Sequence, residues 1–344
     1  MYKEKNIYNP TLEIKDLSIG YRGRKKKMTF LQNNLNLNFY QGDMVCLIGP
    51  NGCGKSTFIR TIAALQHPIK GKIIIKGVDI NTMSAKSRSE FFSVVLTDRT
   101  AVDGITVAEI VALGRYQSSS WLGTLSRIDH EKIDWAIGQV GLDGFEERMY
   151  WTLSDGEKQR AFIAKALSSD APVMLLDEPT SHLDIPNRVE VMTLLQRLTR
   201  EFGHSVILST HDLDLALQMA DEIWLMIPGK GVLASTPEEL MYSGYLDEVF
   251  GNEVLRFNNH SGTFLVTTKD KVPACVKGRG NMLEYTIQAL HRLGFSNNGN
   301  EDSIVKVNVS DESWIVDFKG EISHFTCLID VCRFLKKIEL FVYT

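Results

Sequence analysis

A glycine-rich segment with one lysine and two hydroxyl side chains has the clearest chemistry in the chain. The segment is Gly49–Thr57, GPNGCGKST, and it directly follows the apolar run Met44–Ile48. The pattern G-x-x-x-x-G-K-[ST] between a strand and a helix is the P-loop, whose backbone N–H groups surround phosphate oxygens. We therefore predict that a nucleoside triphosphate binds here, through Gly49, Pro50, Asn51, Gly52, Cys53, Gly54, Lys55, Ser56 and Thr57.

A helix is expected from Lys55 to about Leu65, and its positive N-terminal end would add to the attraction for phosphate. Lys55 should reach the β- and γ-phosphates, and the Ser56 hydroxyl should hold Mg²⁺.

Two adjacent carboxylates follow a second apolar run, Val173–Leu176. We expect Asp177, which ends the run, to act on Mg²⁺. Glu178 would point to the other side of the chain and accept a proton from the attacking water. A surface turn that happens to carry two acids is the alternative, and the apolar residues before it and Pro179 after it argue against that reading.

Further motifs follow in a fixed order. They are Leu153–Arg160 (LSDGEKQR), Val173–Thr180, Ser181–Asp184 and Ser209–Asp212 (STHD). In this order and spacing they resemble the nucleotide-binding subunit of ABC transporters, over about residues 10 to 255. The resemblance implies an α/β fold: a P-loop ABC-type ATPase domain with a mixed sheet core and a helical subdomain. It also implies that the protein hydrolyses ATP with Mg²⁺ as cofactor.

The resemblance assigns roles to three side chains around the triphosphate. His211 matches the switch histidine of the family, which would contact the γ-phosphate and link Glu178 to it. Glu178, His211 and Lys55 are thus the candidate catalytic residues. Tyr21 matches the aromatic residue that stacks on adenine.

Residues Ser154-Asp155-Gly156-Glu157 form a capping box, S-x-x-E, at a predicted helix N-terminus, and such an end binds anions. In the resembled family this end meets the γ-phosphate bound by the other protomer. Ser154, Gly156 and Glu157 would then contact ATP across a head-to-tail homodimer that holds two ATP molecules. Asp184 would lie across the same interface.

Two positions depart from the family pattern. The family usually places a glutamine after the strand that here reads Phe92–Leu96, where it senses Mg²⁺ and reaches towards the permease. This chain has Thr97-Asp98-Arg99 instead. Thr97 is the best positional match as a metal-side residue, and Asp98 is the alternative. Asp155 replaces a glycine that is common in the signature.

Composition fits a globular protein that works without its own membrane span. The chain has 344 residues, 44% of them hydrophobic and 23% charged. A net charge of −4 argues against nucleic acid as a partner. No apolar stretch approaches the roughly 20 residues of a membrane-spanning helix, and the first residues carry no apolar signal-peptide core. We expect a peripheral protein on the cytoplasmic face of the inner (plasma) membrane.

The five cysteines show no C-x-x-C spacing, so neither a disulfide framework nor a zinc site is supported.

Periodicity divides the chain into two domains. Alternating strands at 12–19 and 30–39, with a basic loop at 22–27 between them, and the apolar strands 44–48, 173–176 and 205–209 place an ATPase domain at 10–257. Helices at 106–116 and 129–142 fall in a helical subdomain at about 100–168, and a capping box at 236–239 starts the last helices. A small C-terminal α+β module would cover 258–344, with strands at 261–268, 304–309 and 314–318 and helices at 282–293 and 327–338. The apolar stripe of helix 282–293 should pack on the module's own sheet; docking on a second copy, or gating after binding cargo or metal, is the alternative.

Four short segments resemble the branch that serves iron–siderophore, haem and vitamin B12 uptake. They are Gly104–Val107, Leu113–Tyr116, Trp121–Gly123 and Leu125-Ser126. This resemblance implies separate integral-membrane permease subunits and, through them, a periplasmic or surface substrate-binding protein. Two alternatives remain: a soluble ABC ATPase of translation or DNA repair, and an importer subunit for another substrate that the C-terminal module regulates.

Overall fold

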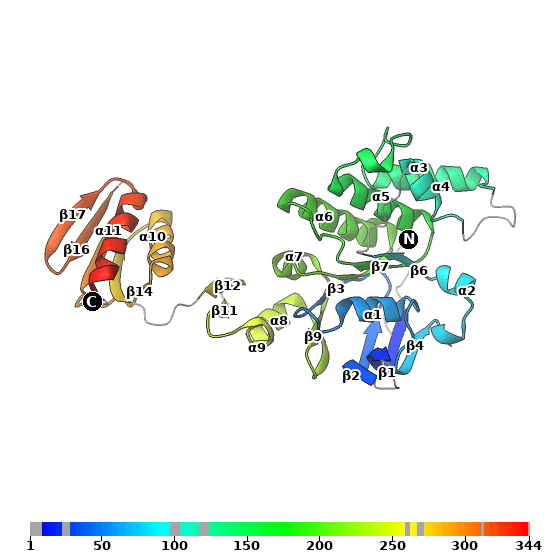
Figure 1. Cartoon of the computed structure of the whole chain (residues 1–344), viewed down its shortest axis with the longest axis horizontal. Helices are drawn as coiled ribbons and strands as arrows, with labels where there is room; N and C mark the ends of the chain where they lie inside the picture. The colour runs from blue at the N-terminus through cyan, green and yellow to red at the C-terminus, as the bar shows by residue number, and fades with distance from the viewer. Residues whose placement is uncertain are drawn as a thin grey trace, which may run out of the picture. The chain divides into compact units, whose positions relative to one another are not determined.

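The computed structural model describes residues 9–22, 28–96, 104–116, 124–258, 262–266, 272–310 and 313–342. The chain forms two compact units, which Figure 1 colours along the chain. The first unit consists of Met1–Gly251 with Phe257–Thr263, and the second of Asn252–Arg256 with Phe264–Thr344. Each is described separately below.

The first unit is built on a six-stranded sheet in the order β10-β9-β3-β8-β7-β6. Its strands are β3 (Met44–Ile48), β6 (Phe92–Val95), β7 (Val173–Asp177), β8 (Ser205–Ser209), β9 (Glu222–Ile227) and β10 (Gly231–Ser235). All neighbours pair in parallel except β10, which runs antiparallel to β9. Every residue of β3, β7 and β8 is buried, which explains their almost wholly apolar sequences. The three predicted apolar strands are confirmed, and β7 extends one residue further, to Asp177.

A second, antiparallel sheet in the order β2-β1-β4-β5 faces helix α1. It contains β1 (Leu12–Arg22), β2 (Met28–Phe39), β4 (Lys70–Ile75) and β5 (Val78–Asp79), and α1 covers Lys55–Ile62. One buried core cluster combines residues of this sheet, Phe58 and Ile59 of α1, and Val45 and Leu47 of the main sheet. The helix carrying the P-loop lysine is thus fixed on both sides. Of the predicted basic loop, residues 23–27 lie outside the described part.

Three helices form the predicted helical subdomain. They are α3 (Val107–Ala112), α4 (Arg127–Gln139) and α5 (Asp155–Ser168), and they pack against one another. Both α3 and α4 begin with a full capping box, at Thr106 and Ser126. A buried guanidinium joins all three helices: Arg115 donates to Asp129 Oδ1, to the Ser168 carbonyl and to Asp170 Oδ2, each at 2.8 Å. Because Arg115 and Asp129 are both 6% exposed, this pairing is part of the subdomain's interior.

The remaining helices of the first unit border the main sheet or end the unit. They are α2 (Ala85–Ser89), α6 (Ile185–Phe202), α7 (Leu213–Met219), α8 (Pro237–Ser243) and α9 (Tyr245–Phe250), with short 3₁₀ turns at Ile80–Thr82 and Tyr150–Thr152. The predicted start of α8 is confirmed, with Pro237 in the first turn and the Thr236 side chain accepting from the Glu239 N–H. No helix in the described part of the chain is long and apolar enough to cross a membrane.

The second unit is a five-stranded sheet with two helices on one face (Figure 1). Its strand order is β14-β13-β15-β16-β17, from β13 (Val272–Gly278), β14 (Phe295–Asn297), β15 (Val305–Val309), β16 (Trp314–Phe318) and β17 (Glu321–Phe325). The helices are α10 (Asn281–Arg292) and α11 (Leu328–Val342). The strands predicted at 304–309 and 314–318 are present as β15 and β16, and they pair antiparallel. Leu290 and Leu293 lie in the same core cluster as Trp314, so the stripe of α10 packs on the unit's own sheet as expected.

A strand is present within 261–268 as predicted, but it does not belong to the five-stranded sheet of this module. The described part of 261–268 forms β12 (Thr263–Val266), which pairs with β11 (Leu255–Asn258) in a separate two-stranded sheet. The place in the five-stranded sheet belongs to β13, whose sequence VPACVKG includes a proline and lacks the plain alternation that marks a half-buried strand. The sequence analysis did not predict three strands of the five-stranded sheet, β13, β14 and β17.

Candidate active site

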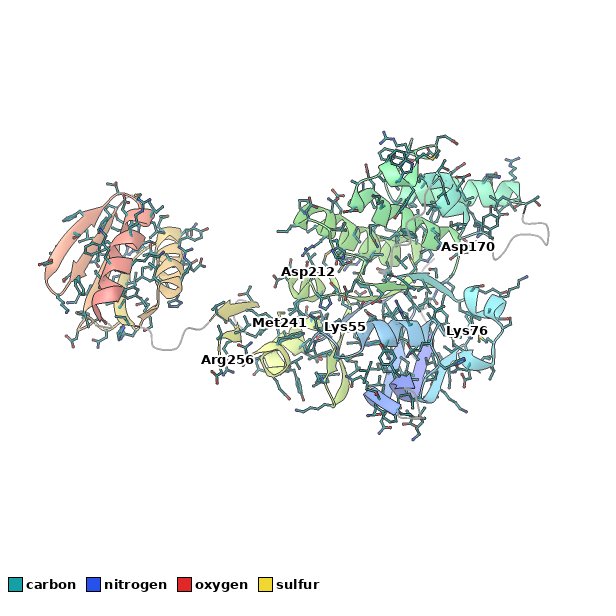
Figure 2. All side chains as sticks on the ribbon, in the orientation of Figure 1. Lys55, Lys76, Asp170, Asp212, Met241 and Arg256 are labelled. Carbon is teal, nitrogen blue, oxygen red and sulfur yellow. The ribbon has the colours of Figure 1, made fainter. Side chains whose placement is uncertain are left out.

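The loop before α1 has the backbone that a phosphate site requires. Gly52 and Gly54 have φ angles of 77° and 111°, a region that favours glycine. Lys55 is the first residue of α1 (Figure 2) and is 5% exposed. Its Nζ donates to the carbonyl oxygens of Gly49 at 2.7 Å and Pro50 at 3.2 Å. Burial lowers the pKa of the Lys55 ammonium, while the nearby carboxylates of Glu178 and Asp177 act in the opposite direction.

A cavity of ≈ 300 Å³ collects side chains that lie far apart in the sequence. It is lined by Tyr21, Leu31, Asn51, Gly52, Gly54, Lys55, Ser56, Thr57, Glu178 and His211. Seven of the fourteen predicted nucleotide-binding residues and all three candidate catalytic residues, Lys55, Glu178 and His211, therefore meet at one place. Tyr21 and Leu31 come from β1 and β2 of the antiparallel sheet. The other lining residues follow the carboxyl-terminal ends of the parallel strands β3, β7 and β8, where ligands of such sheets bind.

The acid pair at the end of β7 is held by β8. The Ser209 hydroxyl donates to Asp177 Oδ1 at 2.7 Å, and the Glu178 N–H donates to Ser209 Oγ at 3.0 Å. Glu178 has a φ of 51°, a strained left-handed conformation for this residue type. Its Oε1 lies 2.7 Å from His211 Nε2, so the predicted link between the two side chains exists in the structure. The carboxylate of Glu178 is thereby oriented by a second side chain.

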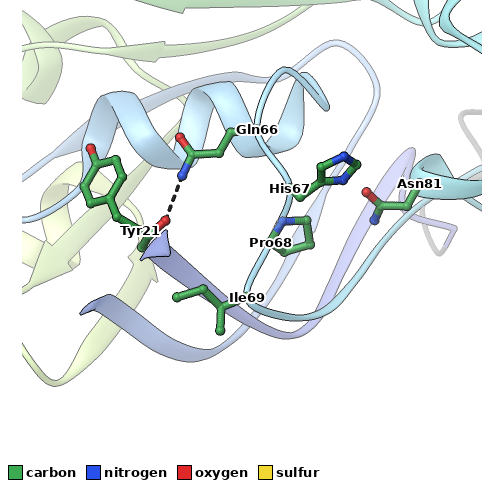
Figure 3. Close-up of a pocket in the computed structure, with 7 residues that line it drawn as sticks. Tyr21, Gln66, His67, Pro68, Ile69 and Asn81 are labelled. Atoms are coloured by element: carbon green, nitrogen blue, oxygen red, sulfur yellow. Dashed lines mark hydrogen bonds between the residues drawn. The ribbon is translucent and has the colours of Figure 1, made fainter. Parts of the chain in front are cut away.

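Tyr21 lies beside the loop, and its hydroxyl is 2.8 Å from Thr57 Oγ1. Tyr21 also borders a larger cavity of ≈ 650 Å³, whose other walls are Gly20, Gln66, His67, Pro68, Ile69 and Asn81 (Figure 3). There the Gln66 side chain donates to the Gly20 carbonyl at 2.8 Å, which fixes the backbone next to Tyr21.

The residues of the predicted signature form a second cluster with their own contacts. The capping box is complete: Glu157 accepts from the Ser154 N–H at 2.7 Å, and Ser154 Oγ accepts from the Glu157 N–H at 3.3 Å. A Cβ on Gly156 would come within 2.4 Å of Asn187 Oδ1, so a larger residue here would require the Asn187 side chain to move. Of the described residues that line the P-loop cavity, none belongs to Ser154–Glu157 or is Asp184.

Asp184 has a local structural role. It is the N-cap of α6, where its Oδ1 accepts from the Asn187 N–H at 3.2 Å and from Asn187 Nδ2 at 2.6 Å. A capping contact of this kind orders the loop that begins the helix.

Asp155, the residue in place of a common glycine, is exposed. Its Oδ1 lies 3.9 Å from Lys158 Nζ, one turn further along α5. The added negative charge is therefore partly balanced within the helix, at a side chain that is 57% exposed.

Three supporting residues were not predicted from the sequence as site residues. Ser209 joins Asp177 to Glu178. Arg188 donates to the Leu183 carbonyl at 2.7 Å and lies 3.5 Å from Asp212, so it connects the Asp184 loop to the segment after β8. Gln32 is 1% exposed and donates to the Cys53 carbonyl at 3.2 Å. This hydrogen bond helps to hold the backbone of the P-loop in place. The adjacent motifs could have suggested Ser209, but no sequence signal marks Gln32, because irregular pairing of β1 with β2 sets its direction.

The oxygen donors at this site suit a magnesium ion whose remaining ligands come from the substrate. Ser56 offers a hydroxyl and Asp177 a carboxylate that is 2% exposed, both hard oxygen donors of the kind that Mg²⁺ prefers. Among the described residues no group of three or more His, Cys, Asp or Glu side chains could hold a metal alone. Such a set fits an ion bound by one or two protein oxygens together with nucleotide phosphates. Thr97, the third predicted ligand, and Asp98 lie outside the described residues.

The fold and site together define a P-loop ATPase of the ATP-binding-cassette class. Comparison with known proteins agrees: the family model "ABC transporter" matches residues 32–181, and the model "Iron ABC transporter C-terminal domain" matches residues 271–336. The chain belongs to the ABC transporter family as one of its ATP-binding, ATP-hydrolysing subunits.

Individual relatives give the same picture. The petrobactin import ATP-binding protein FpuC of Bacillus anthracis is 37% identical over 235 residues, which cover 68% of this chain and 86% of FpuC. The iron(3+)-hydroxamate import ATP-binding protein FhuC of Bacillus subtilis is 33% identical over 70% of this chain and 87% of its own length. A solved dimer of the ATP-binding cassette MJ0796, in a post-hydrolysis state with ADP and Pi, superposes with a TM-score of 0.58 at 26% identity, covering 66% of this chain and 98% of that chain.

Proposed function

We propose that this chain powers an importer for iron chelates of the siderophore class, as a peripheral ATPase on the cytoplasmic face of the plasma membrane. The observation that carries the proposal is the iron-transporter C-terminal domain at residues 271–336, in the same chain as the cassette. The names of FpuC and FhuC, a petrobactin and an iron(3+)-hydroxamate import protein, support the same cargo class. We place the ATPase domain at 10–257 and the accessory module at 258–344.

Hydrolysis would use Glu178 as the general base. Its carboxylate, held 2.7 Å from His211 Nε2, would take the proton of the water that attacks the γ-phosphate. His211 would orient the carboxylate and contact the γ-phosphate. Lys55 would leave the loop carbonyls and pair with the β- and γ-phosphates, where its positive charge stabilises the charge that develops on transfer.

Magnesium would be held by Ser56 and Asp177, with Thr97 on the metal side. When bound, the ion neutralises charge on the phosphate oxygens. Alanine at Thr97 and at Asp98 tests the altered position: one change should raise the Mg²⁺ requirement or slow hydrolysis, and the other should be nearly silent. If both are silent, with and without the permease, this loop has no coupling role.

The complete site would require two copies of the chain. Tyr21 and the P-loop of one protomer would hold ATP, while Ser154, Gly156, Glu157 and Asp184 of the other would close over its γ-phosphate. The complete capping box at Ser154 supports this role, because a helix N-terminus favours anions. The solved structure of the cassette MJ0796, which is dimeric and holds ADP and Pi, supports a dimer.

Co-purification and transport test the cargo assignment. The chain should purify with integral-membrane permease subunits and restore ATP-dependent uptake of ferric siderophore by vesicles that also contain the substrate-binding protein. Haem and cobalamin in parallel assays are the competing cargoes. Uptake of either one without siderophore uptake would overturn the iron-chelate assignment, and failure to bind any permease would favour a non-transport ATPase.

A further inference from the structure

A cavity of ≈ 370 Å³ opens between the two helices of the second unit. Four of its residues come from one face of α11, at the i, i+3, i+4 and i+7 spacing that places side chains side by side, and two come from the C-terminal end of α10. The lining consists of Arg292, Leu293, Ile329, Cys332, Arg333 and Lys336.

Three of these six side chains are cations. The whole region 272–344 holds eight Lys and Arg against nine Asp and Glu, so the positive charge is a local concentration. Like charges that line one cavity repel each other. An anion bound between them attracts each cation and so offsets this repulsion.

The cations have little internal compensation. Arg333 donates to Asp330 Oδ1 at 3.0 Å, but both side chains are at least half exposed and such pairs are weak. Among the side chains that the structure describes, no ion pair involves Arg292 or Lys336.

We propose that this cavity binds a small molecule with two or more oxyanion groups, carboxylate or phosphate. The planar guanidinium groups of Arg292 and Arg333 match either group with paired hydrogen bonds, and Lys336 adds a point charge. Leu293 and Ile329 give an apolar wall for the carbon skeleton. The volume suits a metabolite-sized ligand. The proposal does not depend on which cargo the transporter carries.

Calorimetric titration of the full-length protein with citrate and, separately, with pyrophosphate tests the site at constant ionic strength without magnesium. The variant Arg292→Gln/Lys336→Gln should weaken binding of at least one of them by tenfold or more. The control Arg279→Gln/Lys319→Gln removes the same charge from exposed positions outside the cavity and should bind as the unaltered protein does. Binding of citrate would indicate a ligand with carboxylate groups, and binding of pyrophosphate a ligand with phosphate groups. Absence of binding, or equal binding by both variants, would overturn the proposal.

A thiol footprint gives a second readout. Cys332 lines the cavity, whereas Cys327 lies outside it and donates to Asp330 Oδ2 at 2.9 Å. The bound anion should slow alkylation of Cys332 several-fold and leave Cys327 unchanged, as tandem mass spectrometry can resolve. Protection that survives in Arg292→Gln/Lys336→Gln would place the ligand elsewhere.

Discussion

The two units of the chain bury their sheets in different ways. In the first unit, β3, β7 and β8 are buried at every residue, so polar side chains gather where these strands end, at Asp177 and Ser209. In the second unit, helices cover one face, and polar residues such as Lys306 and Asn308 alternate along β15 with buried valines. A sheet covered on both faces concentrates its chemistry at one edge. A sheet covered on one face leaves its polar groups dispersed, which suits binding and regulation better than catalysis.

The largest effect should come from the edge of the first sheet. Glu178→Gln keeps the shape and the contact with His211 but removes the base, so turnover should fall by roughly 10²–10⁴-fold while MgATP still binds. Steady-state ATPase rates and nucleotide binding measure the two quantities. Glu201→Gln, on the exposed part of α6, is the control. Near-normal hydrolysis by Glu178→Gln would remove this residue from the mechanism.

A buried charge should matter to only one of the two units. Arg115→Met leaves Asp129 with hydrogen bonds from Ser126 but without its cation, and it should destabilise the first unit by about 3 kcal/mol, the lower end of the cost of breaking a buried ion pair. Arg127→Met removes a pair with Glu131 whose side chains are 92% and 60% exposed, so it should cost less than about 1 kcal/mol. Chemical denaturation, with fluorescence and circular dichroism as probes, compares them. If the second unit unfolds together with the first in Arg115→Met, the units are not independent.

Removing the loop cation should affect binding more than stability. Lys55→Ala should weaken MgATP binding by roughly 10–100-fold, since hydrogen bonds to charged groups contribute about 1.5–3 kcal/mol. Lys86→Ala, an exposed position on α2, provides the matched loss of charge. Equal affinity in the two variants, measured by titration with a fluorescent nucleotide, would mean that Lys55 does not contact the phosphates.

Low pH should reduce the stability of the first unit, because Asp129 becomes protonated. Hydrogen bonds from Ser126, followed by Arg115, lower the pKa of this carboxyl from 3.8 to about 2. A lowered pKa stabilises the fold above the unfolded value, and this contribution is lost as the pH falls from about 4 to 2. Asp129→Asn should be less stable at neutral pH and lose less of its melting temperature over that range. Asp134→Asn, an exposed change on the same helix, should follow the unaltered protein; identical acid profiles for Asp129→Asn and the unaltered protein would contradict the assignment.

The smallest effect should follow from removing the second unit. A chain that ends at Asn258 keeps the P-loop, Glu178 and His211, and compact domains often fold alone, so basal MgATPase should stay within about twofold. Dimer fraction and permease-coupled transport are where a loss is expected. A folded but inactive truncated protein would show that the two units share the catalytic task.

The sequence by itself determined the parts whose hydrogen bonds close within a few residues. The turn of the P-loop and the helix starts at Ser154 (α5) and Thr236 (α8) follow this rule, because local partners fix their conformations. Tertiary structure alone decided the rest. Gln32 is turned inward by the irregular pairing of β1 with β2, Ser209 meets Asp177 only because β7 lies beside β8, and β13 has its place in a sheet through partners more than twenty residues away. Those contacts depend on strand register and on distant neighbours, which no short window of sequence records.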